Sequence, residues 1–154
     1  MGESRSSSMV MLVAEDNPAD VVFFNEALEE SQTRAEVHVV DNGVDALRYL
    51  RRQEPFAEAP RPNVMVLDLN LPLKNGQDVL LEMAADAGLR AIPVAILTTS
   101  TSEAHVGRTY TSGRCLYFVK TDQIKRLRDI VREIAAFAQG IPKYEDRGSE
   151  NITD

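Results

Sequence analysis

Four short apolar runs, each ending at a polar side chain, constrain the fold of this chain more than any other feature. The runs are residues 9–14, 64–67, 93–97 and 116–119. The first two are followed directly by acidic residues, the third by Thr98 and the fourth by Lys120. Short, wholly apolar runs of this kind are typical of strands buried on both faces of a sheet. We therefore expect a strand at each of these four runs, each with a polar group at its carboxyl end.

Helical patterns separate these strands. Asn17 is a suitable N-cap and Pro18 a suitable first helical residue, which predicts a helix that runs to about Glu30. A further strand is expected at 36–40, followed by a turn at 41–43. The other expected helices are 44–50, 77–87, 102–112 and 124–137.

Strand and helix thus alternate five times, with connections too long for hairpins. This pattern predicts an α/β fold with a doubly wound, five-stranded parallel sheet and helices on both faces. A switch point beside the first strand gives the flavodoxin-like strand order 2-1-3-4-5. We expect residues 9–139 to form one domain, preceded by a disordered N-terminus at 1–8 and followed by a polar tail at 140–154.

The composition argues against several classes of protein. A formal charge of -7 and a pI near 4.9 do not suit nucleic-acid binding, which usually needs a basic face. No apolar run approaches the roughly 20 residues of a transmembrane helix, and the N-terminus lacks a signal-peptide core. The single Cys115 excludes an internal disulfide and suits a reducing compartment. We therefore expect a cytoplasmic protein that binds neither nucleic acid nor membrane.

Right-handed crossovers bring the carboxyl ends of the strands together at one edge of the sheet. The side chains expected there are Glu15, Asp16, Asp68, Thr98 and Lys120. Clustered carboxylates repel one another and need a counter-charge, and oxygen ligands of this kind suit Mg²⁺. Such a site can receive a phosphoryl group on Asp68, with the cation and Lys120 neutralising the charge on the phosphoryl oxygens.

Each of these residues also has a simpler explanation. Asp16 and Asn17 could cap the following helix, Thr98 could cap the helix at 102–112, and Lys120 could be a solvated strand end. Their conjunction at one edge of one sheet is what favours a divalent-metal phosphoacceptor site.

The arrangement resembles the receiver domain of two-component response regulators. The motifs that carry the resemblance are Glu15-Asp16 after the first strand, Asp68 followed by LPLKNG, Thr98 after the fourth strand and Lys120 after the fifth. The likeness extends from about Met9 to Phe137. The segments VAEDNPAD, DNGVDALRYLR, APRPNVMVLDLNLPLKNG and AIPVAILTTS are further similar to single-domain receivers encoded beside bacterial phytochromes.

The resemblance implies that Asp68 is a phosphoacceptor supplied by a histidine kinase, and the narrower likeness points to a bacterial phytochrome as that kinase. It also implies a Mg²⁺ cofactor. The implied ligands are Asp16, Asp68 and the backbone carbonyl of Asn70, with Glu15 acting through water.

The same resemblance implies that Thr98 is the switch hydroxyl, Tyr117 the aromatic residue coupled to it, and Lys120 the ion-pair partner of the phosphoryl group. One position departs from the pattern, because receivers nearly always carry Lys-Pro with a cis bond where this chain has Lys120-Thr121. A cis bond before a residue other than proline costs about 2.5–4 kcal/mol. We therefore expect a trans bond, a difference that bears on the placement of Lys120.

We expect a signalling protein rather than an enzyme, since no output domain is expected after the helix at 124–137. Output would then pass through a partner or through a homodimer. By the resemblance, the dimer surface would comprise 102–112, 116–119 and 124–137. The first part of the tail contains Ile141, Pro142 and Tyr144, and we expect it to dock on the helix at 124–137 or on a partner subunit.

Two other functions remain open. One is a degenerate receiver that acts as a phosphorylation-independent binding module, its switch disabled by Thr121. The other is an aspartyl-nucleophile phosphatase, which would normally carry a second Asp two residues after the nucleophile. Asn70 occupies that position here and argues against the phosphatase.

Overall fold

A five-stranded parallel sheet forms the centre of the molecule. The computed structural model describes residues 9–99 and 115–140. The strands are β1 (Met9–Ala14), β2 (Ala35–Val40), β3 (Val64–Leu67), β4 (Val94–Thr98) and β5 (Cys115–Val119). Their order is β2-β1-β3-β4-β5, and every neighbouring pair is parallel. The predicted fold class and strand order are therefore confirmed.

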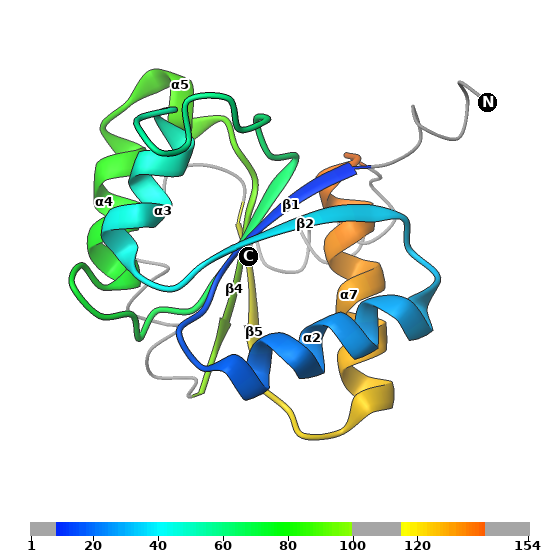
Figure 1. The fold of residues 1–154 in the computed structure, drawn as a ribbon. Coiled ribbons are helices and arrows are strands. Elements are labelled where there is room, and N and C mark those ends of the chain that lie inside the picture. The colour runs from blue at the N-terminus through cyan, green and yellow to red at the C-terminus, as the bar shows by residue number, and fades with distance from the viewer. Residues whose placement is uncertain (1–8, 100–114, 141–154) are drawn as a thin grey trace, which may run out of the picture.

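Helices cover both faces of this sheet. They are α2 (Pro18–Ser31), α3 (Gly43–Leu50), α4 (Gly76–Ala84), α5 (Ala87–Arg90) and α7 (Ile124–Ala138). Figure 1 shows α2 and α7 on one face, and α3, α4 and α5 on the other. The expected helix at 102–112, the N-terminus at 1–8 and most of the tail lie outside the described residues.

Two apolar cores, one on each face, explain why the inner strands β1, β3 and β4 are apolar until they end, whereas the edge strand β2 carries Glu36 and His38. Successive side chains of a strand point to opposite faces. Along β4, Val94 and Ile96 accordingly join the core beneath α3 and α4, whereas Ala95 and Leu97 join the core beneath α2 and α7. Both kinds of position are buried, so no polar residue is tolerated until the strand ends.

Asparagine caps start three of the helices. The Asn17 side chain accepts a hydrogen bond from the Ala19 N–H at 2.9 Å, and Pro18 follows as the first helical residue. Asn42 and Asn75 cap α3 and α4 in the same way. The predicted start of the first helix is thus confirmed. The caps also fix where the helices that follow β1, β2 and β3 begin.

Two sequence-based details were wrong. Gly43 is the first residue of α3 rather than part of a turn. The helix expected at 77–87 ends at Ala84, because the Asp86 side chain accepts a hydrogen bond from the Gly88 N–H and caps the separate helix α5. Within α2, Phe24 and Ala27 supply the buried face, and Val22 is 58% exposed.

Within the described ranges, none of the helices is both long and apolar enough to span a bilayer.

Candidate functional site

The ends of β1 and β3 place two acidic side chains next to each other. The backbone ladder continues past both strands, because the Glu15 N–H donates to the Val40 carbonyl at 3.0 Å and the Asp68 N–H donates to the Ala14 carbonyl at 3.1 Å. Glu15 is 7% exposed and Asp68 is 5% exposed. The sheet therefore fixes two nearly buried carboxyl groups at the edge that the sequence predicted.

Asp16 completes an acidic group with these two residues. One carboxylate oxygen from each of Glu15, Asp16 and Asp68 lies within 4.8 Å of the others. Glu15 and Asp68 are buried, whereas Asp16 is exposed. Three oxygen ligands at this spacing, one of them open to solvent, match the needs of a hard divalent cation that keeps part of its water shell.

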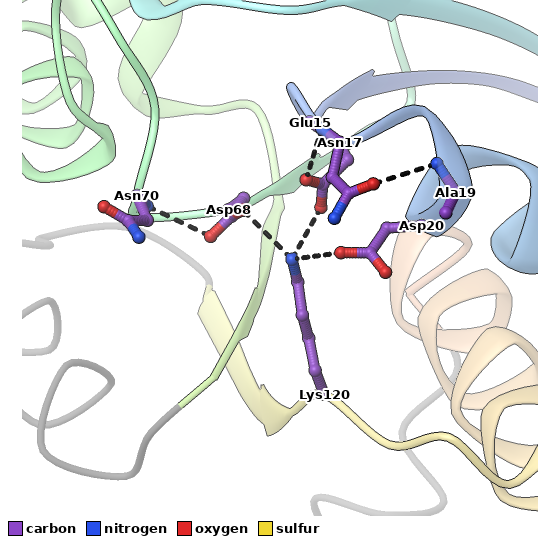
Figure 2. A network of polar contacts seen from close by, with 7 residues as sticks. All are labelled: Glu15, Asn17, Ala19, Asp20, Asp68, Asn70 and Lys120. Carbon is purple, nitrogen blue, oxygen red and sulfur yellow. Dashed lines mark hydrogen bonds and ion pairs between the residues drawn. The ribbon is translucent and has the colours of Figure 1, made fainter.

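Lys120 is the positive group of the pocket. Its Nζ lies 2.8 Å from Glu15 Oε1, 3.1 Å from Asp68 Oδ2 and 2.8 Å from Asp20 Oδ2, as Figure 2 shows. The bond between Lys120 and Thr121 is trans, as expected, since the only cis bond among the described residues is Glu54–Pro55. The missing proline therefore does not keep the lysine out of the site.

The electrostatics of the pocket follow from burial and ion pairing. Burial raises the pKa of Glu15, hydrogen bonds from Lys120 and the Asn17 N–H oppose that rise, and the negative charge of Asp68 adds to it. The pKa of Lys120 is raised: burial acts to lower it, but its hydrogen bonds to Asp20, Glu15 and Asp68 outweigh burial. Lys120 therefore stays charged at neutral pH. One ammonium among several carboxylates leaves the pocket short of positive charge.

Asp68 is held by both carboxylate oxygens. Oδ1 accepts a hydrogen bond from the Asn70 N–H at 3.0 Å, and Oδ2 faces Lys120. The following loop is fixed by Gly76, whose N–H donates to the Leu69 carbonyl at 2.9 Å. A Cβ at Gly76 would lie 2.5 Å from Leu69 Cα and 2.7 Å from the Asp68 carbonyl oxygen. Only glycine allows this close approach, so the loop sequence LPLKNG directly shapes the surroundings of Asp68.

Thr98 and Tyr117 lie on one face of the sheet. Thr98 is fully buried at the end of β4. Tyr117 pairs with Ile96 in the β4–β5 register and packs beside the core beneath α3 and α4. Thr98 follows Ile96 by two residues, so its side chain points to the same face as those of Ile96 and Tyr117. Thr98 itself pairs with Val119, so the predicted switch pair occupies diagonal positions on adjacent strands.

Asp20 is a member of the site that the sequence analysis missed. It lies in the first turn of α2, three residues after the Asn17 cap. The signal was present in the sequence, because a carboxylate in the first turn of a helix that follows β1 faces the same edge of the sheet. The residues predicted to meet there, Glu15, Asp16, Asp68 and Lys120, do meet.

Comparison with known proteins identifies the family. A family model described as the response regulator receiver domain matches residues 11–132. The chain belongs to the response regulator receiver domain family, which confirms the resemblance drawn from the sequence.

Individual relatives resemble the chain along most of its length. Response regulator Rcp1 from Synechocystis sp. is 35% identical over 137 residues, which cover 89% of this chain and 93% of Rcp1. The structure of the phosphorylated cyanobacterial phytochrome response regulator RcpA superposes with a TM-score of 0.75 at 36% identity, covering 86% of this chain and 94% of RcpA. The Mn²⁺-bound form of Rcp1 gives a TM-score of 0.72 at 34% identity, covering 84% of this chain and 93% of that one.

Proposed function

We propose that this chain is a response regulator that accepts a phosphoryl group from a histidine kinase on Asp68 in a Mg²⁺-dependent reaction. The observation that carries the proposal is the pocket itself, in which a buried carboxylate faces Lys120 and two further acidic side chains. Membership of the receiver family supports it.

The transfer would form a bond between an Asp68 carboxylate oxygen and phosphorus while the phosphorus–nitrogen bond of the kinase phosphohistidine breaks. The imidazole leaves with the electron pair of that bond and takes up a proton. The Asn70 N–H holds the carboxylate of Asp68 in one orientation, and Lys120 is close enough to pair with a phosphoryl oxygen in place of Asp68 Oδ2. Positioning and charge neutralisation supply most of the rate in such a reaction.

A divalent cation fits the donor set of the pocket. Asp16, Asp68 and the backbone carbonyl of Asn70 would hold it, with Glu15 acting through water. When bound, the cation would supply positive charge next to the transferred phosphoryl oxygens. The Mn²⁺-bound form of the relative Rcp1 supports a divalent ion in this family, and the preference of Mg²⁺ for a few carboxylates plus water leads us to propose Mg²⁺ here.

The signal would leave the pocket through Thr98 and Tyr117. A phosphoryl group on Asp68 attracts the Thr98 hydroxyl, and the space that Thr98 vacates admits the Tyr117 ring. Their diagonal positions on the same face of the neighbouring strands β4 and β5 support this coupling. The protein would then act as a signalling protein and not as an enzyme with turnover on a substrate.

The phytochrome in the name of RcpA supports a bacterial phytochrome as the histidine kinase. Output would pass through protein–protein contacts, including a homodimer formed by residues 102–112, β5, α7 and the first part of the tail. A cytoplasmic location without nucleic-acid or membrane binding remains our prediction from the sequence.

The experiment that tests the phosphoacceptor uses acetyl phosphate and intact-mass spectrometry. The wild-type chain with Mg²⁺ should gain the mass of one phosphoryl group, and chelation with EDTA should abolish the gain. Asp68→Asn should gain none, whereas Asp78→Asn, which changes an exposed acid on α4, should behave as wild type. Transfer from a phosphorylated phytochrome kinase to the wild type and to Asp68→Asn then tests the partner.

The outcomes separate the competing functions. A wild-type chain that gains no phosphoryl mass from either donor would leave the binding-module function, with its switch disabled at Thr121. Steady turnover of a small phosphate ester would favour the phosphatase, although Asn70 stands where that class carries its general acid.

The homodimer has its own test. Deleting residues after Gly140 should weaken dimerisation if the tail contributes to the interface. Light scattering on the full chain and on the shortened chain measures this, and an unchanged mass would contradict a role for the tail.

A further inference from the structure

Three carboxylates contact the ammonium of Lys120, which equals the number of its N–H donors. Glu15, Asp20 and Asp68 each place one oxygen within 3.1 Å of Nζ, and an ammonium has three N–H donors. The three contacts converge from β1, α2 and β3, as Figure 2 shows. The lysine is therefore fully coordinated before any phosphoryl group arrives.

Two of these partners have a second role in the function proposed above. Asp68 is the phosphoacceptor and Glu15 belongs to the acidic group that suits a cation. When the pocket is loaded, both carboxylates take on competing contacts, and their hold on Lys120 weakens. Asp20 lies outside that acidic group, so it is the one carboxylate contact of Lys120 with no competing role.

The surroundings of Asp20 suit an anchor. The Asn17 cap fixes the start of α2, and Phe24 and Ala27 bury the helix against the sheet. The Asp20 side chain is 39% exposed and that of Lys120 only 19%. A carboxylate on a rigid helix can thus hold the ammonium from the solvent side, opposite the buried acids.

We propose that Asp20 is a positioning residue that keeps the Lys120 ammonium at Asp68 while the pocket is loaded. The proposal rests on the phosphoacceptor function of Asp68. The contact with Asp20 would thus tether the Lys120 side chain in a chain that has Thr121 as the next residue, where receivers nearly always carry proline. The competing explanation is that Asp20 only stabilises α2, as an acidic residue in the first turn of a helix does.

Phosphorylation kinetics with acetyl phosphate and Mg²⁺ test the proposal. Asp20→Asn should slow phosphorylation of Asp68 about fivefold, the effect of a partly exposed ion pair worth about 1 kcal/mol. Asp20→Glu should restore most of the rate. Asp78→Asn removes the first-turn acid of α4 and should leave the rate unchanged. A rate for Asp20→Asn within about twofold of the wild type would overturn the proposal.

A double-mutant cycle shows whether Asp20 acts through Lys120. If it does, Asp20→Asn should cost nothing further in a Lys120→Met background, because the group that it positions is gone. An equal loss in both backgrounds would overturn the proposal and assign Asp20 a role independent of the lysine.

A measurement that needs no phosphorylation separates failure of this inference from failure of the proposed function. NMR relaxation of the Lys120 side-chain end in the metal-free protein should give a lower order parameter in Asp20→Asn than in the wild type and in Asp78→Asn. Unchanged order would overturn the inference even if Asp68 is phosphorylated. A wild-type chain that is never phosphorylated would instead refute the proposed function. The order parameter of the Lys120 side-chain end would still show whether Asp20 tethers it.

Discussion

Replacing Lys120 with methionine should destabilise the metal-free protein by about 3 kcal/mol. Methionine keeps much of the length and apolar bulk of the lysine stem, so the change isolates the charge. Lys120 is the counter-charge for Glu15 and Asp68, which are nearly buried. No other Lys or Arg in the described parts of the chain forms an ion pair with either of them. The variant therefore leaves two neighbouring buried carboxylates without compensation.

The magnitude follows from the contact distances. At 2.8–3.1 Å, each charge pair attracts by roughly 5–6 kcal/mol at an effective dielectric constant of about 20. Desolvation of the ammonium offsets most of this gross attraction. Measured losses on removing one partner of a buried pair are about 3–5 kcal/mol. The lower end applies here because the Lys120 side chain keeps 19% of its exposure and Asp20 keeps 39%.

Urea denaturation followed by far-UV circular dichroism, in EDTA and in excess Mg²⁺, measures the effect. A loss of about 3 kcal/mol in a domain of this size lowers the melting temperature by roughly 6–12 °C. Bound Mg²⁺ should reduce the difference in unfolding free energy between the variant and the wild type by more than half, since the cation replaces the missing positive charge. Acidification should also reduce this difference in unfolding free energy. Burial raises the pKa of Glu15, and protonation of Glu15 removes one of the uncompensated charges.

Lys125→Met is the matched control, because Lys125 is exposed on α7, and it should leave stability unchanged. A loss below about 1 kcal/mol for Lys120→Met in EDTA, the scale of a surface pair, would refute the reasoning. So would a loss that Mg²⁺ does not reduce.

Two further predictions concern the loop after β3 and the helix that follows it. Gly76→Ala should cost about 1–3 kcal/mol in urea denaturation, because its Cβ would meet Leu69 Cα at 2.5 Å. Gly88→Ala meets its nearest atom at 3.4 Å and should cost nothing. The Lys74 ammonium holds the pKa of Glu82 below its ordinary value of 4.5, so this carboxylate stabilises the fold above about pH 4.5 and that contribution is lost as the pH falls through its lower native pKa. Glu82→Gln should therefore lose up to about 1 kcal/mol at neutral pH and match the wild type in acid, and a pH-independent difference would contradict this.

The inner strands β1, β3 and β4 were predictable from the sequence because burial on both faces forbids polar residues within them. Val64 to Leu67 are all buried, and the first polar residue, Asp68, lies where the strand ends. The same rule located Glu15 and Thr98, whereas Lys120 follows an apolar run in the edge strand β5, which is only partly buried. Strand ends of a parallel sheet share one edge, so placing the strands also placed the pocket.

Asp20 and α5 were missed for a different reason. The position of Asp20 in a helical first turn is consistent with simple helix stabilisation, and only the reach of Lys120 across 100 positions of sequence separation makes it part of the site. The break after Ala84 depends on a local competition, in which the Asp86 side chain captures N–H groups of the next turn. Helical periodicity carries neither kind of information.

Lys120 connects the pocket to the sheet through its side chain and its backbone. Its ammonium contacts Glu15 and Asp68, while its backbone N–H donates to the Thr98 carbonyl at 2.6 Å. One backbone hydrogen bond therefore joins the residue that neutralises the acids to the end of β4, which carries the proposed switch hydroxyl of Thr98. In the proposed function, a phosphoryl group on Asp68 would change the electrostatic attraction on Lys120, and this hydrogen bond would transmit the change to the end of β4. If Asp20 tethers the ammonium as proposed, the lysine would move little, and the proposed switch hydroxyl of Thr98 would respond instead.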